Sequence, residues 1–332
     1  MRLLFKLVTG FILASILLVP ISGLSGCSPA APSPVRIGYL LGDLHQLPFF
    51  VAVDKGYFGD EGLQIEIVGP FDAGPAEMDA LAAGQIDVGY VGMAPAVLAA
   101  ARKIPLSIVS GVNLEGSGLV TSMKIGSVDE LKSKKIATPL PGSIQHVMFG
   151  MLLSDNDLRY SDIELFPGTV KPPDMPQSLQ TGRIDGYFVW EPFVAKAVVG
   201  SYGKVLKESK DIWPDHPCCV IVAAGDFSSS HDGTVAAVIR AHRKAISFIE
   251  SNPAEAKAIA AKWTRLDPAV IDNAFQRVKY TYSLNKDDVK KFVGEIIALG
   301  EKATIKPIIT TADVPDLDGF ANMVVDTKYI QR

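Results

Sequence analysis

The sequence lacks four features that would each point directly to a class of function. It has no tract of basic residues, and its formal net charge is −4, so a nucleic-acid partner is not expected. It has no obvious catalytic triad, so we predict no enzyme and no cofactor, and it has no loop rich in histidine that would strongly support a receptor for metal. Beyond its amino-terminal segment it has no apolar stretch of membrane-spanning length, so a soluble body is expected.

The amino terminus has the layout of a secretory signal. MRLLFKLVTGFILASILLVPISGLSGCS contains two cations, then an apolar run, then small residues that end at Cys27. Residues 24–27, Leu-Ser-Gly-Cys, resemble the lipobox of bacterial lipoproteins, which implies that residues 1–26 are removed and that Cys27 is lipidated. Residues 27–34 would then tether a body that lipid anchors to a membrane, facing the periplasm or the cell exterior. The alternative is an ordinary amino-terminal membrane anchor.

Short runs rich in Val and Ile alternate with longer amphipathic stretches, as in VRIGYL, LPFFVAVDKGYF and LQIEIV. This alternation predicts an α/β chain with largely parallel sheets. One unit occurs twice, because LAAGQIDVGYVGMAP at 81–95 aligns with LQTGRIDGYFVWEP at 179–192 after one single-residue gap. Each copy predicts a helix end with a glycine cap, a buried strand and a new helix opened by proline.

The length and the repeated unit both indicate two lobes. About 300 residues exceed what one compact core usually serves, and two copies of a unit favour two lobes of similar construction. The chain is predicted to cross between the lobes after about residue 122, and to return near HPCCVIVAAGDF at 216–227. The first lobe would comprise 35–122 plus 225–332, and the second lobe 123–224.

The stretch VRIGYLLGDLHQLPFFVAVDKGYFGDEGL resembles the opening of solute-binding proteins of ABC importers of the nitrate, sulfonate and taurine type. IDVGYVGMAP, SVDELKSKKIATPLPGSIQH and DGYFVWEP continue the resemblance. It implies a two-lobed, type II periplasmic-binding-protein-like α/β fold, in which each lobe has a mostly parallel sheet flanked by helices and the ligand cleft lies between the lobes.

The same resemblance implies a function. The protein would capture a small molecule, either a sulfonate-, nitrate- or taurine-type anion or a small heterocycle, and deliver it as a monomer to the permease subunits of an ABC importer. A distant branch of this fold makes or binds the pyrimidine precursor of thiamine, so an enzyme of that branch is one alternative, which export argues against. A receptor that captures metal through His and Cys side chains is the other alternative.

In open α/β sheets the ligand lies beyond the carboxyl ends of the strands, where helices begin. Free amide groups at helix starts attract anions, and aromatic side chains there can stack on planar ligands. The residues predicted on this basis to bind the ligand are His45, Gln46, Met93, Ala94, Gly142, Ser143, His146, Tyr187, Trp190, Glu191, Cys218 and Cys219.

Several of these residues have an ordinary structural alternative. His45 could be a solvated loop histidine, Met93 could pack in the core, and Ser143 could be a plain helix N-cap. Trp190 could be a buried core aromatic, and Glu191 an acid that favours the start of a helix.

The adjacent pair Cys218 and Cys219 admits three interpretations. A disulfide between neighbours is strained, because consecutive Cα atoms lie about 3.8 Å apart whereas ordinary bridges prefer at least about 4.4 Å. A metal site would combine His216 and one thiolate, such as Cys218, with His45 or His146 from across the cleft. In the third interpretation both cysteines are simply small buried residues. Adjacent strand residues point to opposite faces, so only one cysteine is expected to face a given pocket.

Overall fold

The computed structural model describes residues 33–302 and 304–331, which belong to one compact body, Ser33–Arg332. Among these residues, no helix has both the length and the apolar character that crossing a bilayer requires. The predicted signal, the lipidation site at Cys27 and the predicted tether up to residue 32 lie outside the described residues.

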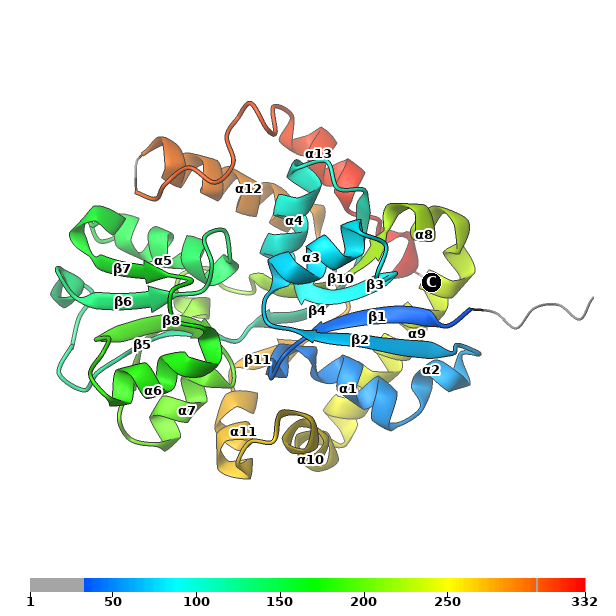
Figure 1. Ribbon diagram of the computed structural model, residues 1–332, viewed down its shortest axis with the longest axis horizontal. Helices are drawn as coiled ribbons and strands as arrows, with labels where there is room; N and C mark the ends of the chain where they lie inside the picture. Colours follow the sequence, from blue (N-terminus) through cyan, green and yellow to red (C-terminus); the bar gives the residue numbers. More distant parts are fainter. Residues whose placement is uncertain (1–32, 303, 332) are drawn as a thin grey trace, which may run out of the picture. The chain divides into compact units, whose positions relative to one another are not determined.

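Two sheets organise the body (Figure 1). The first has the strand order β11-β4-β10-β3-β1-β2, and the second has the order β7-β6-β8-β5-β9. The first sheet contains β1 (Val35–Leu40), β2 (Ile65–Phe71), β3 (Val88–Gly92), β4 (Leu106–Glu115), β10 (Pro217–Ala224) and β11 (Val278–Tyr280). The second sheet contains β5 (Ser117–Thr121), β6 (Lys135–Thr138), β7 (Glu164–Pro167), β8 (Gly186–Trp190) and β9 (Lys204–Glu208).

Helices connect and flank the strands (Figure 1). The helices that connect strands β1 to β4 of the first sheet are α1 (Leu47–Asp54), α2 (Tyr57–Asp60), α3 (Gly74–Ala82) and α4 (Met93–Ala101). Those of the second sheet are α5 (Ile144–Ser154), α6 (Met175–Gln180) and α7 (Phe193–Val199). The carboxyl-terminal helices are α8 (Gly225–Ser230), α9 (Asp232–Ser251), α10 (Pro253–Thr264), α11 (Pro268–Phe275), α12 (Lys286–Glu301) and α13 (Leu317–Val324).

The predicted fold class is confirmed, and each sheet combines a parallel part with an antiparallel part. Strands β2, β1 and β3 are parallel, as are β7, β6 and β8. Strand β10 is antiparallel to β3, because it begins where β3 ends and pairs Cys219 with Gly92. Strand β5 is antiparallel to β8 for the same reason, pairing Ser117 with Trp190. The two strands that enter a sheet directly from the other sheet, β10 and β5, thus run antiparallel to its parallel part, and at the edge of the first sheet β11 is antiparallel to β4.

The repeated unit is confirmed as one structural unit in each sheet. Helix α3 leads through Gly84 to β3 and α4, and helix α6 leads through Gly182 to β8 and α7. Both glycines have a positive φ, +68° and +71°, which is the left-handed conformation that closes a helix at low cost when the residue is glycine. The ends of β3 and β8 therefore have equivalent positions in the two sheets.

Gly116 is the residue at which the chain passes from the first sheet to the second, between the end of β4 and the start of β5. Its φ is +81°, and its carbonyl accepts hydrogen bonds from the Glu191 amide at 2.8 Å and faces Nε2 of His45 at 2.8 Å. The chain returns between Glu208 and Pro217. The lobe boundaries at 122 and 224 stay a prediction.

Two carboxyl-terminal helices contact the helices of both sheets. Helix α11 packs against α7, and α12 packs against α5, α4 and α13. In Figure 1, α12 lies above the region where the two sheets face each other. The segment that follows the return crossing therefore supports both halves of the body.

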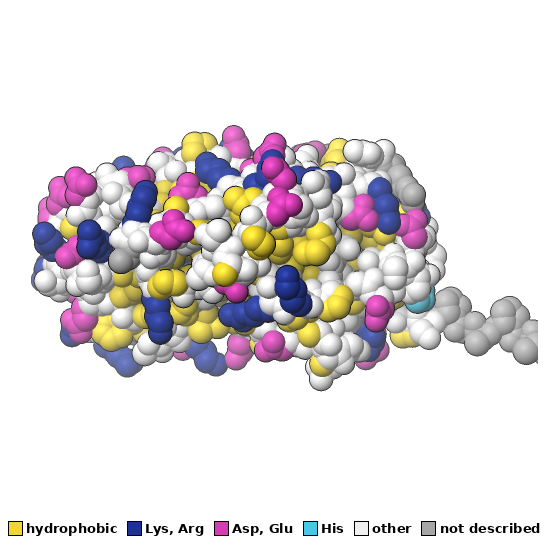
Figure 2. All heavy atoms as spheres, turned by 90° about the horizontal axis from the view of Figure 1, so that it is seen from above, with side chains coloured by type: hydrophobic (Ala, Val, Ile, Leu, Met, Phe, Trp, Pro, Cys, Tyr) yellow, Lys and Arg dark blue, Asp and Glu magenta, His cyan; other side chains and the backbone are white. Residues whose placement is uncertain are grey.

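The face that carries α12 and α13 shows both signs of charge (Figure 2). Lys and Arg side chains alternate there with Asp and Glu, and hydrophobic side chains gather between them. One such ion pair joins Lys290 of α12 to Asp318 beside it in α13, at 2.9 Å. Exposed pairs of this kind stabilise little, and a mixed surface does not provide the basic field that nucleic acid requires.

Gly116→Ala should destabilise the body by about 3 kcal/mol or more. The left-handed conformation alone costs a residue with a side chain about 1–2 kcal/mol, and a Cβ at position 116 would overlap the imidazole of His45. Gly62→Ala is the control, because Gly62 has a φ of +76° but no atom within 4 Å of the added Cβ. Chemical unfolding of both variants checks the difference, and equal losses would contradict it.

Candidate functional site

A cavity of about 60 Å³ lies where the two sheets meet. Its wall combines loops that follow strands of the first sheet, the loop and helix start after β6, the end of β8 and the start of β10. One water occupies roughly 10–15 Å³ by this measure, so the space holds a handful of water-sized groups. The cavity lies at the carboxyl ends of parallel strands, which is the place that open α/β sheets offer a ligand.

Five of the predicted binding residues line this cavity, namely His45, Ser143, Trp190, Cys218 and Cys219. Ser143 also caps α5, because its hydroxyl oxygen accepts a hydrogen bond from the His146 amide at 3.2 Å. The indole nitrogen of Trp190 is buried and has no hydrogen-bond partner among the described residues. Trp190 therefore brings an unused donor to the cavity wall.

The other predicted residues have structural partners away from the cavity. Gln46 joins β1 to β3, because its amide oxygen accepts from the Leu40 amide at 2.8 Å and its amide nitrogen donates to the Tyr90 carbonyl at 2.6 Å. Met93 and Ala94 are fully buried in α4.

The remaining three side chains and one glycine also make local contacts. Nδ1 of His146 lies 3.1 Å from the Thr138 hydroxyl, and burial lowers the pKa of this histidine to about 4. The Tyr187 hydroxyl donates to the Phe193 carbonyl at 2.9 Å. Gly142 has a φ of +87° and lies against Leu98, and Glu191 pairs with Arg277. A binding role for all seven stays a prediction.

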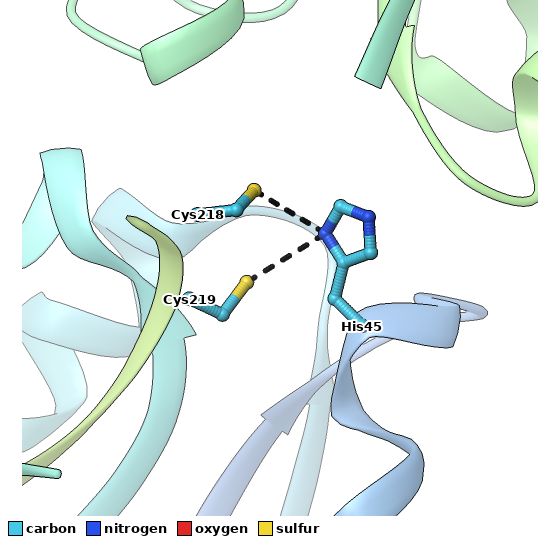
Figure 3. A group of neighbouring side chains, drawn as sticks. All are labelled: His45, Cys218 and Cys219. Atoms are coloured by element: carbon cyan, nitrogen blue, oxygen red, sulfur yellow. Dashed lines mark hydrogen bonds between the residues drawn. The ribbon is translucent and has the colours of Figure 1, made fainter. Parts of the chain in front are cut away.

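His45, Cys218 and Cys219 form the central cluster of the cavity wall, which we call the thiol–imidazole cluster (Figure 3). Nδ1 of His45 lies 3.3 Å from Sγ of Cys218 and 3.9 Å from Sγ of Cys219. The other ring nitrogen, Nε2, lies 2.8 Å from the Gly116 carbonyl oxygen. Because a carbonyl can only accept, Nε2 carries a proton and donates it, and the thiols share the Nδ1 side of the ring.

The expectation that only one cysteine faces a given pocket is wrong, because both sulfurs face the same imidazole nitrogen (Figure 3). The reason is a β-bulge in β10. Pro217 pairs with Leu114 of β4 and Cys219 pairs with the next residue, Asn113, so Cys218 is the extra residue. A bulge interrupts the alternation of side chains and re-aims one of them.

Asn113 holds this bulge in place. Its side-chain oxygen accepts a hydrogen bond from the Cys219 amide at 3.2 Å, and its side-chain nitrogen donates to the carbonyls of Leu114 and Glu115, each at 3.3 Å. The side chain is fully buried. It therefore satisfies an amide that the interrupted ladder would leave unpaired.

Charge is concentrated in the thiol–imidazole cluster. Burial alone would lower the pKa of His45, but the Cys218 thiolate and the Asp43 carboxylate raise it to about 9. A hydrogen bond from Cys219 and the charge of His45 hold the pKa of Cys218 well below its usual range. The same hydrogen bond, together with burial, raises the pKa of Cys219. The opposite pKa shifts therefore favour ionisation of Cys218 beside a positively charged His45, while Cys219 holds its proton more firmly.

Three polar residues near the cluster were not predicted from the sequence. Asp43 lines the cavity, and burial raises its pKa to about 6. Gln145 donates to the Ser117 hydroxyl at 3.0 Å and reaches Sγ of Cys218 at 3.8 Å. The third residue is Asn113, a polar residue that interrupts an apolar strand. Asp43 directly precedes LHQ, and Gln145 lies within SIQH. Their polar character in these segments was the sequence feature that could have identified them as site residues.

The ion pair of Glu191 and Arg277 joins the end of β8 in the second sheet to the residue that precedes β11 of the first sheet. Oε1 of the fully buried Glu191 accepts from Nη1 of Arg277 at 3.0 Å, and Oε2 accepts from the Ala195 amide in α7 at 3.0 Å. The Glu191 carbonyl accepts from the Leu44 amide at 3.3 Å. Burial raises the pKa of Glu191, and Arg277 lowers it in part. This pair thus connects the loop of His45 to the second sheet.

Comparison with known proteins finds one matching family model and similar proteins that are named for binding. Residues 28–265 match the model of the NMT1-like family. A candidate aliphatic sulfonates-binding protein of Bacillus subtilis (strain 168) is 25% identical over 295 residues, which cover 86% of this chain and 84% of the relative.

Two solved structures share the fold. The ligand-binding component of an ABC-type import system from Staphylococcus aureus, with zinc bound, superposes with a TM-score of 0.74 at 19% identity and covers 91% of this chain and 99% of its own. The periplasmic nitrate-binding protein NrtA from Synechocystis PCC 6803 superposes with a TM-score of 0.78 at 16% identity. The match covers 90% of this chain and 87% of the NrtA chain. The fold is therefore that of periplasmic binding proteins.

Arg277→Met should cost about 3–5 kcal/mol at pH 7, because it leaves the buried Glu191 carboxylate without its cation. Burial raises the folded pKa of Glu191 above the unfolded value of about 4.3. A folded carboxyl with a raised pKa loses stability as pH rises above the unfolded value, so the variant's deficit should shrink as pH falls toward 4. Unfolding measured from pH 4 to 8 checks this.

The control is the double variant Glu191→Gln/Arg277→Met, which carries no buried charge at this position. It should recover most of the lost stability and should lack the pH dependence of Arg277→Met. An Arg277→Met protein with the same deficit at pH 4 and pH 7 would show that the ion pair does not account for the loss.

Proposed function

The chain belongs to the NMT1-like family, and we propose that it is the solute-binding component of an ABC import system. In this proposal a small molecule occupies the cavity between the two sheets and is passed to permease subunits at the membrane. The observation that carries the proposal is the wall of the cavity, which draws residues from both sheets at the ends of their strands. A ligand held in this way contacts residues of both sheets. Its binding therefore favours the closed conformation, in which the two sheets hold the ligand between them.

The relatives suggest the size and class of the ligand. The Bacillus subtilis relative is named for aliphatic sulfonates, and the Synechocystis structure is named for nitrate. Both kinds of ligand are small and polar. The wall of this cavity contains His45, whose positive charge is balanced by Asp43 and Cys218 beside it, and none of the described residues that line the cavity is Lys or Arg. We therefore favour a neutral or zwitterionic molecule, such as a taurine-type sulfonate or a small heterocycle, over a bare anion.

Trp190 provides the polar contact that we assign to this ligand. Its buried indole N–H has no partner among the described residues, and a buried donor is normally paired. An acceptor oxygen or nitrogen of the ligand would pair it, while the ring covers an apolar or planar part of the molecule. The apolar wall with few polar groups is typical of a small-molecule site.

The cavity is small, so capture requires movement. A ligand larger than a few heavy atoms needs the two sheets to separate and then close around it. The two crossings, at Gly116 and between Glu208 and Pro217, are the only places where the described chain passes between the sheets within residues 88–224. We assign the hinge to these crossings, as in other binding proteins that close around their ligands.

The family relatives favour a binding role over an enzymatic one, because the sulfonate relative and both solved structures are named for binding. Export and lipid attachment at Cys27 complete the proposal. The body would then work outside the cytoplasm, close to the membrane that holds the importer.

Trp190→Phe should weaken ligand binding about tenfold, since it removes one buried hydrogen bond and retains the aromatic ring. Wild type and variant would be titrated with taurine, a short alkanesulfonate, nitrate and neutral heterocycles, with the melting temperature as the readout. Trp263→Phe is the matched control, because its indole nitrogen is also buried and unpaired among the described residues but lies outside the cavity.

Two results would count against this proposal. One is that no compound raises the melting temperature of the wild type and that native mass spectrometry finds no retained small molecule. The other is that Trp190→Phe and Trp263→Phe bind a ligand as tightly as the wild type does, which would place the ligand elsewhere.

Lipid attachment predicts a separate outcome for Cys27→Ala. In cells fed a labelled fatty acid, the wild-type protein should carry the label and sediment with membranes, because a diacylated cysteine anchors stably. The Cys27→Ala protein should carry no label. An unlabelled wild-type protein that still sediments with membranes would instead favour the ordinary amino-terminal anchor.

A further inference from the structure

We propose that His45, Cys218 and Cys219 form a metal-binding site with the ligand set of one imidazole nitrogen and two thiolates, and that it binds Zn²⁺ or an ion of similar softness. The three potential ligand atoms lie within 4.8 Å of one another, and all three residues are buried. Thiolate and imidazole are the donors that Zn²⁺ prefers in proteins. The proposal does not require that the cavity bind an organic molecule.

The separations of the ligand atoms fit tetrahedral coordination. Zn–N bonds of about 2.0–2.1 Å and Zn–S bonds of about 2.3 Å, at a tetrahedral angle, place nitrogen and sulfur about 3.6 Å apart. Nδ1 of His45 lies 3.3 Å from one sulfur and 3.9 Å from the other. Both nitrogen–sulfur separations are therefore within a few tenths of an ångström of those in a tetrahedral site, and the two sulfurs lie within 4.8 Å of each other.

The imidazole already has the orientation of a metal ligand. A ligating histidine usually donates its second ring N–H to a carbonyl or carboxylate, which fixes the tautomer and aims the free nitrogen at the metal. Nε2 of His45 makes this bond with the Gly116 carbonyl at 2.8 Å, and Nδ1 faces the sulfurs. The close approach depends on glycine, because any Cβ at position 116 would overlap the ring.

The backbone also explains why two adjacent cysteines can act together. In a regular strand their sulfurs would lie on opposite faces, whereas the bulge at Cys218 brings both to Nδ1 of His45. Asn113 satisfies the amide that the bulge exposes. Packing alone does not need this irregularity, but two ligands from consecutive residues do.

The charges of the site favour a divalent ion. Binding of Zn²⁺ would release the proton of Cys219 and the proton on Nδ1 of His45, because metal ligands must be deprotonated. The two thiolates then carry a net charge of about −2, which is costly in a buried setting unless it is compensated, and one Zn²⁺ cancels it beside a neutral imidazole. Hard ions such as Mg²⁺ and Ca²⁺ prefer oxygen donors and are disfavoured by this ligand set.

The fourth position of the ion would face the cavity, because all three ligands line it. Sites with three protein ligands leave the fourth position to water or to a bound molecule. His146 and His216 are not part of this group, since Nδ1 of His146 pairs with Thr138 and Nδ1 of His216 lies near the Pro217 carbonyl. The metal would thus offer a coordination point at the floor of the cavity.

The test uses mature protein that is stripped with a chelator and kept reduced with a phosphine, in the absence of organic ligands. Equilibrium dialysis against Zn²⁺, with metal counted by mass spectrometry, should give one ion per chain. His45→Gln, Cys218→Ser and Cys219→Ser should each lose more affinity than the 10–100-fold that removal of an outer partner costs. Co²⁺ should give the absorption bands of thiolate-to-cobalt charge transfer.

His242→Gln is the matched control. This histidine is also fully buried, and its Nε2 also faces a backbone carbonyl, that of Gly111 in β4 at 3.1 Å, but Nδ1 faces the Tyr90 hydroxyl rather than a thiol. It should bind Zn²⁺ as the wild type does. Circular dichroism and the melting temperature without metal show whether each variant is folded, and Zn²⁺ should raise the melting temperature of only the wild type and His242→Gln.

Two outcomes would overturn the site. In one, the wild type binds Zn²⁺ no more tightly than Cys218→Ser/Cys219→Ser. In the other, Co²⁺ binds without charge-transfer bands, which would place the ion away from the sulfurs. Neither outcome affects the function proposed for the cavity, because the Trp190 titration is read with an organic ligand and without added metal.

Discussion

The hydrogen bond between Nε2 of His45 and the Gly116 carbonyl is the contact on which the geometry of the site depends. It joins the loop after β1 to the residue at which the chain leaves the first sheet. It is fully buried and therefore costly to leave unmade. It also settles which ring nitrogen faces the thiols. The position of the crossing and the chemistry of the cavity wall are thus coupled through one carbonyl.

Buried charge is the second constraint, and it is met by pairing. Glu191 is paired with Arg277, and Asp43 lies beside His45. Glu77, fully buried in α3, has no cation beside it among the described residues, and burial and the nearby Asp43 raise its pKa well above the usual range. Buried ionisable groups stabilise a fold less than apolar residues of the same size would. Their concentration near a cavity is typical of functional sites.

The sequence predicted the fold and part of the cavity. Alternating strands and helices, and the unit repeated at 81–95 and 179–192, were sufficient for two α/β sheets with equivalent strand ends. Because ligand sites lie at those ends, residues such as Ser143 and Trp190 could be placed at the cavity from local patterns. The bulge could not be predicted in this way. It depends on how Cys219 pairs with Asn113, 106 residues earlier in the chain, and local patterns do not specify register between strands so far apart.

The position of β10 has a consequence for how the chain acquires its structure during synthesis. Strand β10 lies between β3 and β4, yet the whole second sheet precedes it in the chain. When β1 to β4 leave the ribosome, the central place in their sheet is still vacant. The strands of the second sheet are contiguous in sequence, so this sheet can form before β10 occupies its place between β3 and β4. This central place is filled only when Pro217–Ala224 emerges, so the thiols reach an imidazole that was made about 170 residues earlier, and the edge strand β11 follows later still.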